Sequence, residues 1–223
     1  MDLREAFKTR KSIRGFKPTP VPIEVITDIL DLARLSPSST NSQSWEFVVL
    51  TGKSLEIAKA TNVERTLAGA GMSSDVPVQL YVGQYRERQV ALAKMVYGLM
   101  NIARDDQEGR MQWHLKGMRF FDAPAVILIC LDESVYNRNN QAPLFDAGIV
   151  TQSIVLLALE HGLGTCIQGA SVQYSEALKR ALDIPLSKRL IVSVAVGYPD
   201  WDFPANAVKS EREPLEKLMV WKA

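Results

Sequence analysis

The chain has 223 residues, of which 47% are hydrophobic and 23% charged, an ordinary globular composition with enough apolar residues for a sizeable core. Lysine plus arginine number 26 and aspartate plus glutamate 25, which gives a net charge of +1, so the overall charge indicates binding neither to nucleic acid nor to an anionic membrane. Any site for an anion must therefore be built locally.

The N-terminal part of the chain alternates helical and extended patterns. Leu3 and Phe7, with charges between them, predict a short opening helix. Pro22 can start a second helix because its missing N–H costs nothing at that position, and this helix is expected to end near residues 36–37. Two further elements are expected, a short buried strand at 47–50 and a helix at 53–68.

The middle of the chain, residues 72–122, has the least regular pattern. Two helical stretches are expected there, at 90–102 and at 113–121. A polar break at 104–109 separates them, so we expect two helices joined by a loop.

The second half begins with a continuous apolar run at 126–129, which predicts a buried strand. An almost wholly apolar helix follows at 149–159 and is expected to be buried on all sides, with Gly162 providing a left-handed cap. Three more elements are expected, a strand at 164–167, a helix at 175–182 and a strand at 190–196.

Strands and helices therefore interleave along a chain without repeats or low-complexity linkers. We expect one domain spanning 1–223, an α/β or α+β sandwich of about four strands wrapped by helices. Residues 198–223 resemble an arm more than a packed element. An arm that cannot pack on itself often packs on a partner subunit, which favours a dimer.

Several site classes are not expected. Cys130 and Cys166 each sit in an apolar run, which favours buried thiols in a reducing cytoplasm over a disulfide framework. The charged N-terminus is unlike a signal peptide, and no apolar run approaches the roughly 20 residues of a membrane span. His114 and His161 lack partners at metal-ligand spacing, so no metal site is predicted.

The first candidate motif is Arg10-Lys11-Ser12-Ile13-Arg14. In an extended segment Arg10, Ser12 and Arg14 share one face, and that face could hold a phosphate through charge-assisted hydrogen bonds. Composition alone favours the simpler interpretation, a solvated basic turn.

The second motif is the run from Ser36 to Trp45, SPSSTNSQSW, which is dense in hydroxyl and amide side chains before a strand. Such donors and acceptors suit the edge of a heterocycle or the hydroxyls of a ribityl chain. A plain Ser/Asn-rich turn is an equally good interpretation.

The third and fourth motifs lie in the C-terminal half. In the run 162–170, GLGTCIQGA, a strand ends in Gln168-Gly169, where glycine lets the backbone approach a ligand closely. The alternative is a helix cap followed by a turn. The run 209–215, KSEREPL, is a mixed-charge segment that composition alone assigns to solvated surface.

Together these segments resemble the nitroreductase family over nearly the whole chain. RKSIR at 10–14 is similar to the family's Arg-Arg/His-Ser-x-Arg/Lys signature, and SPSSTNSQSW to its Ser-Pro-Ser-x-x-Asn-x-Gln-Pro-Trp loop, with Ser44 in place of the usual proline. GLGT at 162–165 and VGYP at 196–199 complete the pattern. The segment DWDFPAN at 200–206 resembles, more weakly, the subgroup acting on nitrobenzene-like aromatics.

The resemblance implies a nitroreductase-like α+β fold, with a central, mainly antiparallel sheet wrapped by helices. It also implies an intertwined homodimer with FMN at the interface and the C-terminal arm exchanged. Carried over residue by residue, Arg10, Lys11 and Ser12 bind the FMN phosphate with Arg212, and Lys209 is a weaker candidate. Arg14 lies near the N1–C2=O edge of the flavin. The resemblance places Ile167, Gln168 and Gly169 of the same subunit at the ring. It also has four residues of the other subunit reach the same flavin, namely Pro37, Ser38, Ser39 and Asn41.

The implied reaction takes hydride from NAD(P)H at flavin N5 and passes it to a small organic acceptor, first of all a nitroaromatic, in a ping-pong cycle without a catalytic side chain. Residues 72–122 would cover the ring. Candidates for the acceptor pocket are Met95, Tyr97, Met100, Trp113 and Phe120, although ordinary core packing is the simpler interpretation of any one of them. The alternatives are a quinone or enone reductase or a reductive dehalogenase on the same fold, or a flavin-binding protein that is not an enzyme.

Overall fold

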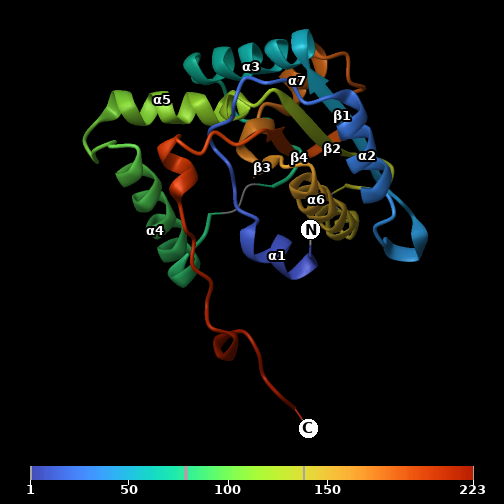
Figure 1. The fold of residues 1–223 in the computed structure, drawn as a ribbon. Coiled ribbons are helices and arrows are strands. Elements are labelled where there is room, and N and C mark those ends of the chain that lie inside the picture. Colours follow the sequence, from blue (N-terminus) through green and yellow to red (C-terminus); the bar gives the residue numbers. More distant parts are fainter. Residues whose placement is uncertain (1, 78–79, 138, 223) are drawn as a thin grey trace.

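The computed structural model describes residues 2–77, 80–137 and 139–222. Its strands form one fully antiparallel sheet in the order β1-β2-β4-β3 (Figure 1). The strands of the described residues are β1 (Trp45–Thr51), β2 (Ala125–Asp132), β3 (Gly164–Gln168) and β4 (Lys188–Gly197). The predicted α+β fold with an antiparallel sheet wrapped by helices is confirmed, and each expected strand is present with slightly longer bounds.

Helices pack around this sheet. The α-helices of the described residues are α1 (Leu3–Thr9), α2 (Ile23–Ala33), α3 (Gly52–Leu67), α4 (Gly83–Leu99), α5 (Gln107–Met118), α6 (Pro143–Glu160) and α7 (Ser175–Ala181). Short 3₁₀ turns add η1 (Ser39–Asn41), η2 (Phe120–Asp122), η3 (Ala170–Val172), η4 (Pro204–Ala207) and η5 (Leu215–Lys217).

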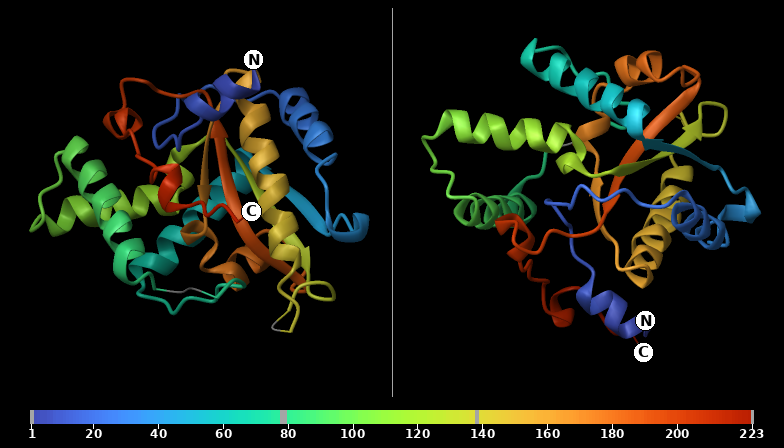
Figure 2. Two further views of the ribbon diagram at one scale, coloured as in Figure 1. Left: turned by 90° about the horizontal axis from the view of Figure 1, so that it is seen from below. Right: turned by 45° about the horizontal axis from the view of Figure 1, so that its top comes forward.

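Strand β2 lies inside the sheet because its residues are apolar almost without interruption, and Ala125 to Leu131 are at most 1% exposed. Successive side chains of a strand point to opposite faces. Ile127 and Ile129 therefore pack toward α2 and α6, while Leu128 and Cys130 pack toward α3 and α7. The sheet is thus the middle of three layers, as the right-hand view of Figure 2 shows.

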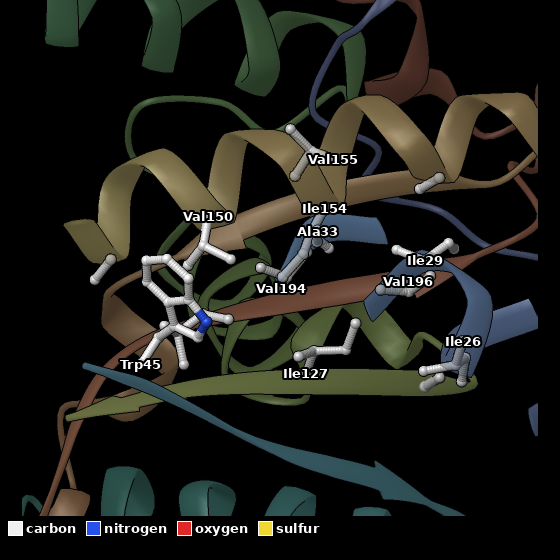
Figure 3. Packing of buried hydrophobic residues seen from close by; sticks show 14 of the residues in the cluster. Ile26, Ile29, Ala33, Trp45, Ile127, Val150, Ile154, Val155, Val194 and Val196 are labelled. Carbon is white, nitrogen blue, oxygen red and sulfur yellow. The ribbon is translucent and has the colours of Figure 1, made fainter. Parts of the chain in front are cut away.

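The layer under α2 and α6 is a close-packed aliphatic core (Figure 3). Ile26, Ile29 and Ala33 recur at helical spacing along α2 and form its buried stripe. Ile154 of α6 and Trp45 of β1 belong to the same cluster. Complete burial of one isoleucine side chain contributes about 1.5–3 kcal/mol to the free energy of unfolding.

Helix α6 differs from its expected environment. Its apolar sequence predicts burial on all sides, but Phe145 is 74% exposed and Gly148 and Ile149 line an open groove. An apolar sequence does not distinguish a core contact from a contact with another chain. Among the described helices, α6 alone is long and apolar enough to span a membrane by composition, with a mean hydropathy of 1.4. Its inner face packs on the sheet, as in a core helix.

Helices α4 and α5 project to one side of the sheet (Figures 1 and 2). They begin at Gly83 and Gln107, earlier than the expected starts at 90 and 113. The first turns of both are polar, so no apolar stripe marks them. Along α4 only Val96 is buried. The chain beyond η4 also leaves the body (Figure 1), and Trp221 near its end is 84% exposed.

An unusual turn joins α5 to β2. Phe120, Phe121 and Asp122 have φ values of 57°, 55° and 58°, a left-handed conformation that costs side-chain-bearing residues roughly 1 kcal/mol or more each. Burial of Phe120, which is 0% exposed, offsets this cost. Asp122 also accepts hydrogen bonds from Lys116 and Arg119, both at 2.8 Å. These contacts fix the direction in which α5 leaves the sheet.

Candidate functional site

The N-terminal basic motif is extended and lies along the outer edge of β3. Ser12 forms a parallel bridge with Thr165, and the Ile13 N–H donates to the Thr165 carbonyl at 2.9 Å. Ile13 is 2% exposed and anchors the segment in the protein. Arg10, Ser12 and Arg14 then line one cleft, as their period of two predicts, and Lys11 joins them.

This cationic cleft has a volume of about 700 Å³ and lies between the basic motif, α4 and the C-terminal arm. Helix α4 contributes Arg88 and Met95, and the arm contributes Ser210 and Arg212. The residues RKSIR and KSEREPL, nearly 200 positions apart in the sequence, therefore meet at one site. Solvated surface, the simple interpretation of the arm segment, does not account for this meeting.

The cleft is electropositive. Burial lowers the pKa of Lys11, and the neighbouring charges of Lys209 and Arg14 lower it further. Two acidic residues, Glu211 and Glu213, also line the cleft. Glu213 is already engaged, because Arg88 contacts it at 3.0 Å and Lys217 at 3.1 Å.

The remaining cations of the cleft have no carboxylate partner among the described residues. They are Arg10, Lys11, Arg14 and Arg212. Such a set, together with the Ser12 hydroxyl, suits a phosphate dianion.

Asn206 is a site residue that the sequence reasoning missed. Its side chain is 1% exposed, and its Oδ1 accepts the N–H groups of Arg14 at 2.7 Å and Gly15 at 3.2 Å. Its Nδ2 donates to the carbonyls of Gly15 and Asp200, both at 2.7 Å. A Cβ on Gly15 would collide with the ring of Phe203. Asn206 therefore fixes the backbone that carries Arg14 into the cleft.

The end of β3 presents its residues in two directions. Ile167 is 42% exposed, and Gly169 follows it at the surface. The Gln168 side chain is buried and turned toward α5, where its Nε2 donates to the Gly117 carbonyl at 3.0 Å. Its Oε1 has no hydrogen-bond partner among the described residues. Ile167 and Gly169 are thus accessible at the end of β3, whereas the Gln168 side chain is held against α5.

The polar loop after α2 does not reach the cationic cleft within the chain. Figure 1 shows it beyond α6, on the opposite side of the molecule. The Ser39 N–H donates to Asp146 at 3.2 Å, and the Ser38 hydroxyl accepts the Gln43 N–H at 2.9 Å. Asn41 has a φ of 59°. Pro37, Ser38, Ser39 and Asn41 therefore belong to an ordered loop that lies apart from the cationic cleft of the same chain.

The candidates for the acceptor pocket separate in the structure. Met95 lines the cationic cleft, and Tyr97 lines a second cleft on the other side of α4. Trp113 stacks on Phe203 with ring centroids 6.5 Å apart. The prediction that Phe120 lines the acceptor pocket is wrong, because its side chain is wholly buried in the core. Met100 lies half-buried after α4.

Comparisons with known proteins agree over the length of the chain. The model of the Nitroreductase family matches residues 7–198. The 4-nitrobenzoate reductase of Pseudomonas putida is 29% identical over 213 residues, which cover 95% of this chain and 92% of that protein. The chloronitrobenzene nitroreductase of Comamonas testosteroni is 30% identical over 221 residues, which cover 97% and 95%.

Solved structures show the same similarity. The FMN and NADPH-dependent nitroreductase NfnB from Sphigopyxis sp. strain HMH superposes with a TM-score of 0.94 at 25% identity, and the match covers 100% of both chains. The FMN-dependent nitroreductase NfnB from Mycobacterium smegmatis, in complex with NADPH, gives a TM-score of 0.92 at 25% identity, again over 100% of both chains.

Proposed function

Because this chain belongs to the nitroreductase family, we infer that it is an FMN-dependent enzyme that uses NAD(P)H to reduce nitroaromatic compounds. The observation that supports this most directly is the cationic cleft, where two distant basic segments meet around about 700 Å³. That volume lies within the usual range of a small-molecule site.

The donor set of the cleft fits FMN. Arg10, Lys11, Ser12 and Arg212 would hold the phosphate, because each offers a donor and none of the cations is neutralised by a described carboxylate. Lys209 adds positive charge next to Lys11. Ile167 and Gly169 would lie against the isoalloxazine ring, where the backbone of β3 ends.

Bound FMN supplies hydride acceptance and donation at its N5. The chain's own residues bind, orient and tune it. Asn206 holds the backbone of Arg14, and the Arg14 guanidinium would stabilise negative charge near the N1–C2=O edge. The described residues hold no cluster of three or more potential metal ligands, and the proposal requires neither a metal nor a catalytic side chain.

We propose further that the working unit is a homodimer in the cytoplasm. Three observations favour a second subunit: the open apolar face of α6, the projecting arm with Trp221 exposed, and the polar loop that its own cleft does not use. The loop residues Ser38, Ser39 and Asn41, with Pro37, would then serve the partner's flavin. Dilution should release FMN as dimers dissociate, and added FMN should stabilise the dimer. A flavin-loaded monomer in sedimentation would contradict the shared site.

The proposed reaction is a ping-pong mechanism with two half-reactions, in which NAD(P)H and the nitroaromatic bind in turn at the same place over the ring. NAD(P)H alone should reduce the flavin, and a nitroaromatic should reoxidise it in a separate step. Steady-state rates should give parallel double-reciprocal lines. Arg14→Gln should slow reduction by NAD(P)H more than it weakens FMN binding, because Arg14 is assigned to charge that develops on reduction. Intersecting lines would refute the cycle.

A different acceptor on the same fold is the second candidate. The iodotyrosine deiodinase of Nematostella vectensis is 24% identical over 230 residues, which cover 98% of this chain and 74% of that protein. Reoxidation of the reduced enzyme by a nitroarene, a quinone and an iodophenol separates the acceptor classes. A preparation that binds FMN but does not oxidise NAD(P)H would identify a flavin-binding protein instead.

A further inference from the structure

A second cleft, of about 960 Å³, lies between α4 and α5. Helix α4 forms a wall of both clefts with opposite faces, because a helix turns by about 100° per residue. Arg88, Leu92 and Met95 face the cationic cleft, whereas Val90 and Tyr97 face the second one. The two sites are therefore neighbours across one helix, in the part of the fold that projects from the sheet (Figure 1).

The second cleft is rich in unpaired positive charge. Its cations are Arg86, Lys94, Arg104 and Arg110. No Asp or Glu lines the cleft, and none of these four cations forms an ion pair within residues 2–77, 80–137 and 139–222. The net charge of +1 over the whole chain hides this local excess. Like charges gathered without counter-charges raise the local concentration of anionic ligands.

The cleft also offers a planar and apolar surface. The Arg110 guanidinium lies over the Tyr97 ring, 4.6 Å from its centroid. Stacking holds a guanidinium in place while its N–H edges stay available for phosphate. Val90, Ala93 and Ile102 line the cleft beside this pair. A ligand that matches the surface carries both phosphate groups and a flat, weakly polar ring.

We propose that the α4–α5 cleft binds the phosphate-bearing adenosine end of the nucleotide donor, and that it makes the enzyme prefer NADPH to NADH through the 2′-phosphate. This inference rests on the proposed function, which supplies a nucleotide whose nicotinamide end reacts at the neighbouring cleft. NADPH differs from NADH by one phosphate monoester, the group that unpaired arginine and lysine side chains recognise best. The donor is thus selected by charge, whereas stacking and shape are left to select the acceptor.

The test uses the FMN-loaded enzyme and the variants Arg104→Gln and Lys94→Gln. Both side chains are exposed, so the substitutions leave the core intact. Each should lower kcat/KM for NADPH by about tenfold, the effect of losing one charge-assisted hydrogen bond, and should lower kcat/KM for NADH several-fold less. Lys53→Gln, an exposed cation of α3, is the matched control and should change neither value.

Two further readouts separate the donor site from other roles. Flavin content should stay at the wild-type level, and chemically reduced enzyme should be reoxidised by 4-nitrobenzoate at the wild-type rate, because that step needs no nucleotide. Adenosine 2′,5′-bisphosphate should compete with NADPH, and its inhibition constant should rise in Arg104→Gln. Unchanged NADPH kinetics in both variants would overturn the inference. A slower reoxidation by 4-nitrobenzoate, but not by nitrobenzene, would overturn it in favour of an acceptor carboxylate site.

The proposed function and this inference can fail separately. If neither nucleotide reduces the wild-type flavin, the proposed function is overturned. Calorimetric titration with adenosine 2′,5′-bisphosphate still tests the cleft in that case. Binding that weakens about tenfold in Arg104→Gln supports it, and the same affinity in both proteins overturns it.

Discussion

Replacing Asn206 with alanine removes one buried side chain that makes four backbone hydrogen bonds, three to Arg14 and Gly15 and one to Asp200. A typical intramolecular hydrogen bond contributes a net 0.5–1.5 kcal/mol, so four bonds contribute about 2–6 kcal/mol to the free energy of unfolding. Water can enter the space left by the side chain and recover part of this. We therefore expect a loss of about 3 kcal/mol, together with at least tenfold weaker FMN binding, because the Arg14 backbone is no longer held.

Asn206→Asp separates the two halves of this network with almost no change in volume. The carboxylate still accepts from Arg14 and Gly15, but it loses both donations and places an acceptor oxygen against two carbonyls. We expect a loss of about 2 kcal/mol at pH 7, from two missing bonds and the uncompensated contact. Urea unfolding of the apoprotein measures the stability, and quenching of flavin fluorescence measures FMN affinity.

Asn62→Ala is the matched control. Asn62 is equally buried, and its Nδ2 donates to the carbonyls of Met118 at 3.0 Å and Ser171 at 2.8 Å, but it contacts neither Arg14 nor Gly15. It should lower stability without the same loss of FMN affinity. The reasoning fails if the free energy of unfolding of Asn206→Ala lies within about 0.5 kcal/mol of the wild-type value, the range typical of neutral surface substitutions. It also fails if both alanine variants lose FMN equally.

Three other substitutions or treatments have defined outcomes. Arg10→Ala should lose about tenfold or more in FMN affinity, because a charge-assisted bond to phosphate contributes about 1.5–3 kcal/mol; a variant purified with full flavin would assign the motif to a basic turn. Burial raises the pKa of the Cys130 thiol to about 12 and that of Cys166 to about 11, from an ordinary 9.0. The contribution of the neutral thiols to the free energy of unfolding is therefore complete below pH 9 and is lost as the pH rises through those values. At pH 8 a thiol reagent should label only unfolded protein. Rapid labelling of the native protein would contradict this. Lys179→Met should cost about 2 kcal/mol, because it removes the ammonium at 3.1 Å from the buried Asp75 side chain while Arg189 stays in place at 3.3 Å. A loss below about 1 kcal/mol in thermal unfolding would show that this pair does not stabilise the region.

The sheet and its two layers could be predicted because their signals are local. The run AVILICLD needs no partner information to be recognised as a buried strand, and Ile26, Ile29 and Ala33 carry a helical stripe in eleven residues. The shared face of Arg10, Ser12 and Arg14 could be predicted for a similar reason. An extended segment with cations at alternate positions gathers them on one face wherever it lies.

The remaining features depend on distant residues. Nothing in the sequence around Asn206 shows that its amide meets a backbone 191 positions away. The left-handed turn at Phe120 contradicts the intrinsic preference of its residue types and exists because the core holds it. The first turn of α4 is polar and gives no apolar stripe, and the charge cluster of the second cleft forms only when the fold brings Arg104 and Arg110 to the side of α4.

The bridge between Ser12 and Thr165 has a consequence for solubility. Strand β3 is an edge strand, and its outer N–H and C=O groups would otherwise be free to pair with another chain. The N-terminal segment covers this edge and donates to it through Ile13. Conditions that detach residues 10–14 from β3 would expose the unpaired edge of this strand in every molecule. Sheet-to-sheet aggregation should then start at β3, and its onset should track release of the N-terminus more closely than melting of the core.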